Sequence, residues 1–306
     1  MNRKKILVKG PVLTRSGYGE QARFALRALR SRPDLFDIFI QPIIWGQTSW
    51  LHEYDEERLW MDRKIEDTVH HINDGQAFDL SLQVTIPYEW EILAMENVGF
   101  TAGIETTKVP HSWLEKNNDN LNRLIVVSEH SKKVFEHTQF EGKNDATGEI
   151  IVLKNTTDIK VVNFPVREYD EIEALGLDLK HEINFITVTQ WSPRKNLENT
   201  LKWFVEEFKD EEVGLVIKTN LVKNCVMDRD ASHHKLRELL VPYPDRKCSV
   251  YLLHGDMSGE EIHSLYHHPK IKAMVSFTHG EGYGLPLFEA AYSGMPIVAP
   301  GWSGHL

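Results

Sequence analysis

The sequence predicts an α/β protein made of two consecutive doubly wound units, each built on a parallel sheet. Three observations predict this class. Short β-rich runs alternate with amphipathic helical segments along the chain. The alternation pauses around Phe164-Pro165-Val166 and then restarts as if from the beginning. The length of 306 residues is large for one core and sufficient for two domains of about 150 residues each. We therefore expect domains over residues 1–165 and 166–306.

The elements of the first half follow from apolar runs and their spacing. A buried strand is expected over residues 5–9, and the next helix has an apolar stripe at i, i+3, i+4 and i+7, made by Ala22, Ala25, Leu26 and Leu29. Ser128 is placed to cap a second helix, because its hydroxyl can accept a hydrogen bond from a free backbone N–H. Further strands are expected over residues 36–44, 80–86, 98–104 and 124–127.

The second half repeats this plan after an acidic stretch over residues 168–180, whose composition favours a helix. A strand is expected over residues 183–189, and a helix over residues 197–208 places four apolar side chains on one face. The remaining expected elements are strands over residues 213–217, 250–253 and 273–277, helical segments near 235–240 and 260–266, and a helix after residue 284.

Composition and charge exclude several classes of protein. The net charge is −10 and no basic stripe is present, which argues against a nucleic-acid binder. No apolar run approaches the roughly 18 residues that a membrane span needs. The apolar stretch behind the charged start is only Ile6-Leu7-Val8, so a signal peptide is not expected. Two cysteines without metal-binding spacing suit a reducing interior, and we expect a cytoplasmic protein.

A glycine-rich loop between a predicted strand and a predicted helix carries the strongest functional signal. Residues 280–284 contain three glycines, which let backbone N–H groups approach a ligand, and the helix start adds the positive end of a dipole. Glu281 lies in the loop and Glu289 in the helix. Two carboxylates beside an anion-binding backbone would repel phosphate, so we expect them to contact neutral hydroxyls. This combination indicates a sugar nucleotide.

Two other strand–loop–helix turns are candidate phosphate sites. The turn over residues 187–196 contains Arg194 and Lys195 and no acid, in a chain of net charge −10. The first loop of the chain contains Gly17-x-Gly19, whose backbone could approach phosphate. For Arg194 and Lys195 the alternative is a solvated helix start, and for the two glycines it is an ordinary tight turn.

These motifs together resemble a known family. Glu281-Gly-Tyr-Gly-Leu-Pro-Leu-Phe-Glu289-Ala, followed by Gly294-Met-Pro-Ile-Val-Ala299, is similar to the signature of the group-1 retaining glycosyltransferases, which have the GT-B fold. The turn over residues 192–196 resembles the phosphate loop of that family, and the resemblance covers residues 183–304. Gln190 stands where the family often has an arginine. The chain stops at Leu306, where family members continue with further helices, so we expect a short C-terminal domain and self-association through it.

The resemblance implies a function and roles for particular residues. It implies two Rossmann-like domains in GT-B arrangement and a metal-independent hexosyltransferase without a cofactor, which moves a sugar from a nucleoside-diphosphate sugar to an acceptor in the cleft between domains. Lys195 and Arg194 would stabilise the departing diphosphate, Glu281 would hold hydroxyls of the donor sugar, and Glu289 would hold the ribose. Further donor contacts are expected at Gly282, Tyr283, Gly284, Leu285, Gly17 and Gly19.

The acceptor side and the alternative functions are less specified by the sequence. Glu105 follows a predicted strand end, where α/β proteins gather ligands, and Glu105, His111 and His130 are the acceptor-side candidates. No metal site is expected. A sugar-nucleotide epimerase of the same fold and a nucleotide-sugar-binding module with little turnover remain as alternatives.

Overall fold

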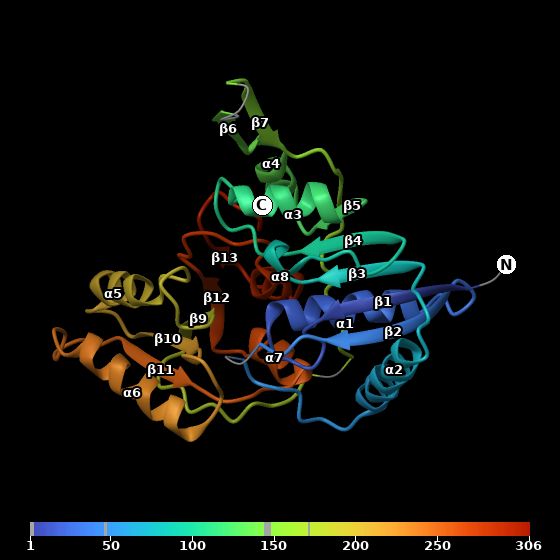
Figure 1. The fold of residues 1–306 in the computed structure, drawn as a ribbon. Helices are drawn as coiled ribbons and strands as arrows, with labels where there is room; N and C mark the ends of the chain where they lie inside the picture. The colour runs from blue at the N-terminus through green and yellow to red at the C-terminus, as the bar shows by residue number, and fades with distance from the viewer. Residues whose placement is uncertain (1–2, 46–47, 144–147, 171) are drawn as a thin grey trace. The chain divides into compact units, whose positions relative to one another are not determined.

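The computed structural model describes residues 3–45, 48–143, 148–170 and 172–306, and the chain divides into two compact units, Met1–Pro165 and Val166–Leu306. Each unit is an α/β structure around its own parallel sheet (Figure 1). The expected fold class is confirmed.

The first unit is organised by a parallel sheet in the order β2-β1-β3-β4-β5-β8. The chain steps from β1 outward to β2 and then returns past β1 to β3. Because crossover connections are right-handed, the two connecting helices lie on opposite faces of the sheet. The strands are β1 Lys4–Gly10, β2 Phe36–Pro42, β3 Leu80–Val84, β4 Glu96–Thr101, β5 Arg123–Val126 and β8 Asp158–Val161.

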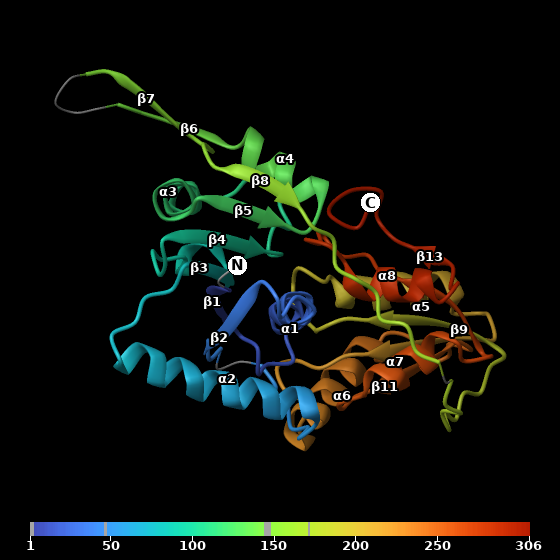
Figure 2. The same cartoon turned by 90° about the vertical axis from the view of Figure 1, so that its right-hand side faces the viewer.

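The helices of the first unit connect these strands. They are α1 Gly17–Arg30, α2 Glu56–Asn73, the short 3-10 helix η1 Pro87–Glu89, α3 His111–Asn120 and α4 Glu129–His137. The predicted apolar stripe of α1 is buried at Ala22, Ala25 and Leu26, and the Ser128 hydroxyl caps α4 by accepting from the N–H of Ser131. An antiparallel hairpin, β6 Gln139–Lys143 and β7 Ile150–Lys154, projects from this unit (Figure 2).

The second unit has a parallel sheet in the order β11-β10-β9-β12-β13. Its strands are β9 Ile183–Val188, β10 Val213–Lys218, β11 Ser249–Leu253, β12 Ile271–Val275 and β13 Ile297–Val298. Its helices are α5 Leu197–Phe208, α6 Val226–Leu240, α7 Gly259–Tyr266 and α8 Leu285–Tyr292.

Alternate side chains of β10 show how this sheet is covered. Leu215 and Ile217 join the apolar cluster formed with α5 and α6, whereas Val216 joins the cluster formed with α7 and α8. A strand that is apolar on both sides is expected in a sheet with helices on both faces. Figure 1 shows α5 and α6 on one side of this sheet and α7 and α8 on the other.

One expected element is wrong. Residues 168–170 and 172–180, predicted to favour a helix, form no helix. Leu175, Leu177 and Leu179 recur every second residue and pack on the α7–α8 side of the sheet, which an extended segment permits and a helix would not. A second acidic run, near residue 55, does begin a helix. Asp55 caps α2, and two glutamates occupy its first turn, where negative charge is stabilising.

Candidate functional site

The candidate site lies at the carboxyl ends of β9 and β12, which are neighbours in the second sheet. From β9 the chain proceeds to β10 on one side, while β12 proceeds to β13 on the other. Such a reversal point is where ligands bind in open α/β sheets. The loop after β9 carries Arg194 and Lys195, and the loop after β12 carries Glu281, so the two strongest sequence motifs meet here.

Asn196 holds the two loops together. Its backbone is in the left-handed region, with φ of 53°, and its side-chain Nδ2 donates a hydrogen bond of 2.9 Å to the carbonyl of Phe277. The N–H of His279 donates to the carbonyl of Arg194 at 2.9 Å. These bonds fix the start of α5 against the glycine-rich loop.

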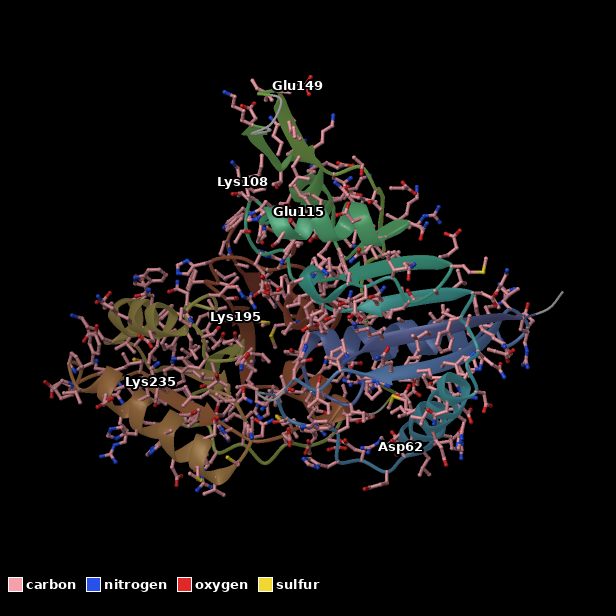
Figure 3. The ribbon with its side chains drawn as sticks, in the orientation of Figure 1. Asp62, Lys108, Glu115, Glu149, Lys195 and Lys235 are labelled. Carbon is pink, nitrogen blue, oxygen red and sulfur yellow. The ribbon has the colours of Figure 1, made fainter. Side chains whose placement is uncertain are left out.

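The charged side chains of the two loops form one cluster. The ammonium Nζ of Lys195 donates to both carboxylate oxygens of Glu281, at 2.5 Å and 2.7 Å. The Nη1 of Arg194 donates to the carbonyl of Gly280 at 2.8 Å and lies 3.4 Å from Glu281 Oε2. Figure 3 labels Lys195 within the second unit.

Burial strengthens this cluster. The side chain of Glu281 is 9% exposed, that of Lys195 is 17% exposed and that of Arg194 is 39% exposed. Charges shielded from water interact more strongly than charges on the surface. The alternative of a solvated helix start is therefore wrong for Lys195, whereas Arg194 keeps part of its guanidinium in solvent.

The glycine-rich loop is held by a segment near the end of the chain. The N–H of Glu281 donates to Ser303 Oγ at 2.8 Å, and the carbonyl of Glu281 accepts from that hydroxyl at 2.7 Å and from the N–H of Gly304 at 2.9 Å. A Cβ on Gly304 would lie 2.0 Å from the carbonyl oxygen of Gly282, so no other residue fits there. The sequence reasoning missed Ser303 and Gly304, because no motif links them to the loop.

Gly284 ends the loop and begins α8. Its φ of 83° lies in the left-handed region, which glycine adopts without strain, and Leu285 opens the helix with Pro286 behind it. Tyr283 is buried with its ring stacked on Phe288, at a centroid distance of 4.4 Å. Burial raises the pKa of the Tyr283 phenol. Gly282, Gly284 and Leu285 thus lie where a backbone-bound ligand would meet the helix start.

Glu289 lies on α8 and is half-buried. Burial and then the nearby Glu289 charge raise the pKa of the Tyr266 phenol, which places this carboxylate beside α7. Glu289 therefore has a different environment from Glu281.

The two candidate glycines of the first unit, Gly17 and Gly19, differ in how closely their surroundings pack. A Cβ on Gly19 would lie 2.1 Å from the carbonyl oxygen of Thr14, so close packing of the turn requires glycine there. A Cβ on Gly17 would meet no atom within 4 Å. Ser16 caps α1 by accepting from the N–H of Gly19 at 2.9 Å. The tight-turn interpretation thus accounts for Gly19, and packing leaves Gly17 unexplained.

The acceptor-side candidates do not form one cluster. Burial first, and then the charge of Glu105 among smaller effects, raise the pKa of Tyr18, so Glu105 lies near the start of α1. A ring nitrogen of His130 lies 3.1 Å from the carbonyl of Thr106, next to Glu105 in the chain. His111 instead packs against Phe140 of the hairpin, with a centroid distance of 6.0 Å.

Asp228-Arg229-Asp230 is an Asp-x-Asp triplet, the metal-chelating motif of another glycosyltransferase fold. Asp228 is engaged in protein contacts, and Asp230 accepts from the Arg229 guanidinium. Over the described ranges 3–45, 48–143, 148–170 and 172–306, no three or more His, Cys, Asp and Glu side chains are grouped to hold a metal ion.

Asp228 belongs to a buried network that the sequence did not reveal. Its carboxylate accepts from the N–H groups of residues 221, 222 and 223 and lies 2.8 Å from His254 Nε2. Burial would raise the pKa of Asp228, but these backbone and imidazole bonds outweigh it and lower the pKa to about 2. The network fixes the loop after β10, which bonds to the Lys195 loop through Gln190 Nε2 and the carbonyl of Leu221, at 3.1 Å.

Among the residues that the structure describes, none of the helices has both the length and the apolar character to cross a membrane.

The chain is similar to known proteins in part of its sequence and in its fold. No family model matches the chain. The serotype-specific mannosyltransferase WbdA of Escherichia coli is 30% identical over 132 residues, which is 42% of this chain and 15% of the relative. The chain therefore matches only a small part of the length of that relative.

Solved structures of low sequence identity share the fold over nearly the whole chain. Anabaena HepE in complex with UDP and glucose matches 99% of this chain and 82% of its own, with 14% identity and a TM-score of 0.58. The catalytic domain of Arabidopsis thaliana starch synthase IV, bound to ADP and acarbose, matches 99% and 84%, with 11% identity and a TM-score of 0.55. Trehalose-6-phosphate synthase matches 98% and 85%, with 13% identity and a TM-score of 0.54. The expected resemblance to glycosyltransferases is confirmed, and the chain shares the α/β fold of these proteins.

Proposed function

We propose that this protein is a retaining glycosyltransferase that moves a sugar from a nucleoside-diphosphate sugar to an acceptor. The observation that carries the proposal is the cluster of Lys195, Arg194 and Glu281 beside the glycine-rich loop, at the reversal point of the second sheet. This cluster combines cations for a diphosphate with a carboxylate for sugar hydroxyls.

The chemistry requires stabilisation of the leaving group. The bond between the anomeric carbon and the diphosphate oxygen breaks, a bond to the acceptor oxygen forms, and the proton of the acceptor hydroxyl passes to the departing diphosphate. Negative charge grows on the diphosphate as the bond breaks. Lys195, Arg194, the backbone of residues 282–284 and the positive end of the α8 dipole would stabilise that charge without a metal ion or a cofactor.

The two glutamates would divide the donor between them. Glu281 lies in the glycine-rich loop beside the cations, where it would accept hydrogen bonds from hydroxyls of the transferring sugar. Glu289, within α8, would accept from the ribose hydroxyls. Tyr283 lies between the two glutamates in the chain and is buried. It would shape the loop through the stacking of its ring on Phe288.

Similar proteins support the choice of donor class. HepE is described with UDP and glucose, starch synthase IV with ADP and acarbose, and WbdA as a mannosyltransferase. A nucleoside diphosphate bearing a hexose is therefore the donor class to test first. We also propose the first unit for the acceptor, with Glu105 and His130 as its first candidates, because the His130 ring on α4 lies beside the carbonyl of Thr106, the residue after Glu105.

Two further proposals concern the whole protein. A cytoplasmic location is supported by the free cysteines Cys225 and Cys248, which suit a reducing compartment. Self-association through the second unit stays a prediction.

A binding module with little turnover is a second candidate function, because Gln190, at the position of the family arginine, is uncharged and bonds to the neighbouring loop.

A donor panel tests the proposal. UDP-, GDP- and ADP-hexoses are incubated with the protein, with and without a mixture of saccharide acceptors, and release of nucleoside diphosphate is measured. We expect release from at least one donor. Binding without release would favour the binding module, and conversion of the donor to an epimer without acceptor would favour the epimerase. Failure of every donor to bind would contradict all three.

A further inference from the structure

The Lys195–Glu281 contact has a consequence for ligand binding. Both carboxylate oxygens of Glu281 accept hydrogen bonds from the same ammonium, at 2.5 Å and 2.7 Å. The pair is largely buried, so water screens it weakly. Lys195 thus already has an anion of the protein against its charge.

A diphosphate that binds Lys195 would bring a second anion to this ammonium. Two anions within contact distance of one buried cation repel each other, and the gain from the diphosphate is reduced by the contact that Glu281 gives up. Because Ser303 and Gly304 hold the backbone of Glu281 by three hydrogen bonds, the exchange would involve its side chain rather than its backbone.

We infer that Glu281 is an internal anion that a nucleoside diphosphate must displace from Lys195, and that this displacement makes the site favour a sugar-bearing donor over the bare nucleoside diphosphate. The inference rests on the proposed function and assigns a specificity role to Glu281. When the donor carries a sugar, its hydroxyls can donate to the displaced carboxylate. The bare nucleoside diphosphate offers no such hydroxyls at that place, so the displaced carboxylate is left uncompensated.

The expected change in nucleotide affinity follows from the fraction of time that Glu281 occupies Lys195. If Glu281 occupies Lys195 for about nine-tenths of the time, the apparent affinity for a competing anion is lowered about tenfold. Removing the charge of Glu281 should then tighten binding of nucleoside diphosphate by about this factor. The same change should not tighten binding of the sugar-bearing donor, since the contact to its hydroxyls is weakened.

The test is isothermal titration of UDP, GDP and ADP into four proteins and one control variant. They are the wild type, Glu281→Gln, Lys195→Gln and the double variant. Glu182→Gln is the matched control, because Glu182 pairs with Lys270 at 2.9 Å at the opposite end of β9 and its replacement changes the net charge equally. We expect about tenfold tighter binding of the preferred nucleotide by Glu281→Gln, and less than a twofold change in the control.

The Lys195→Gln background isolates the mechanism. Without the ammonium, Glu281 keeps only the longer contact to the Arg194 guanidinium, at 3.4 Å, so adding Glu281→Gln should then change the affinity less than twofold. Equal or weaker nucleotide binding by Glu281→Gln would overturn the inference while leaving the proposed function intact. A wild type that binds none of the three nucleotides would overturn the proposed function itself.

A second variant keeps the test decisive if Glu281→Gln folds poorly. Glu281→Ala removes both the charge and the bond to Lys195, and the rise of the melting temperature on adding nucleotide is compared with that of the wild type. A larger rise for the variant supports the inference, and an equal or smaller rise contradicts it.

Discussion

Lys195 is the side chain whose removal is expected to have the largest effect on turnover. Lys195→Ala should lower the rate of nucleoside diphosphate release about a hundredfold at saturating donor, because one preorganised cation on a leaving group contributes about 3 kcal/mol. Lys202→Ala on α5 is the control, since Lys202 is well exposed and makes only a long ion pair of 3.9 Å. A Lys195→Ala variant with the wild-type rate would refute the diphosphate assignment.

Lys195→Ala should also lower the free energy of unfolding. An exposed lysine would contribute little, but Lys195 is 17% exposed and lies against a buried carboxylate. Its loss leaves Glu281 with less compensation, and we expect the free energy of unfolding to fall by about 1–3 kcal/mol. Urea denaturation of Lys195→Ala and Lys202→Ala measures this, and equal midpoints would show that the pair does not stabilise the fold.

Glu281 and Glu289 should differ in their kinetic effects. Glu289→Gln should raise KM for the donor while kcat holds, because the ribose is unchanged by the reaction. Glu281→Gln should lower kcat by about tenfold to a thousandfold, since Glu281 is proposed to contact the sugar, whose charge changes in the transition state. Steady-state kinetics with the accepted donor separates the two, and the reverse order would show that the roles are exchanged.

At this scale the sequence predicts which residue types meet but not how they pair. The spacing of two glutamates around three glycines and the adjacent Arg194 and Lys195 predict a shared site, and the structure brings Arg194, Lys195 and Glu281 together. That Glu281 bonds to Lys195 depends on the order of β9 and β12 in the sheet, which no local pattern contains. The sequence alone predicts unchanged nucleotide binding by Glu281→Gln, whereas the structure leads us to expect tighter binding.

The first turn of α1 gives a prediction at the scale of one element. Gly19→Ala should lower the free energy of unfolding by about 1–3 kcal/mol, because its Cβ would overlap the carbonyl oxygen of Thr14. Gly17→Ala, two residues away and facing open space, should change it by less than about 0.5 kcal/mol. Thermal unfolding of both variants checks this. Equal losses would mean that the turn tolerates no side chain for another reason.

The loop after β10 gives a prediction for pH. The folded-state pKa of Asp228 is about 2, below its ordinary value of 3.8. Its charged form therefore contributes stability above pH 3.8, and this contribution is lost as the pH falls toward 2. Asp228→Asn should cost about 2 kcal/mol at pH 7, and the difference from the wild type should shrink below pH 3.8. Denaturation series at pH 7 and at about pH 2.5 test it; a constant difference would contradict this assignment.

Elements were predictable where one periodicity dominates. The helix over residues 197–208 is found with the predicted bounds, because its apolar stripe packs directly on the sheet. The acidic composition of residues 168–180 predicts a helix. The leucines of this segment, however, recur with period two and pack on the sheet as an extended segment does. α2 was missed because few of its side chains are buried, so its sequence shows little of an apolar stripe.

The whole molecule carries a net charge of −10, yet the proposed donor is an anion. Attraction must therefore come from a local site, and Lys195, Arg194 and the start of α8 would supply it within one edge of the second sheet. No ligand contact is proposed for the β6–β7 hairpin, so the hairpin can serve as an internal reference for ligand effects.

Hydrogen exchange of the full chain with and without the preferred nucleoside diphosphate tests the central claim most directly, since it reports on every backbone amide at once. The account predicts that nucleotide slows exchange in residues 189–196 and 278–284, the two loops that the cluster joins, while the hairpin strands Gln139–Lys143 and Ile150–Lys154 are unchanged. Protection elsewhere with none in these two loops would contradict it.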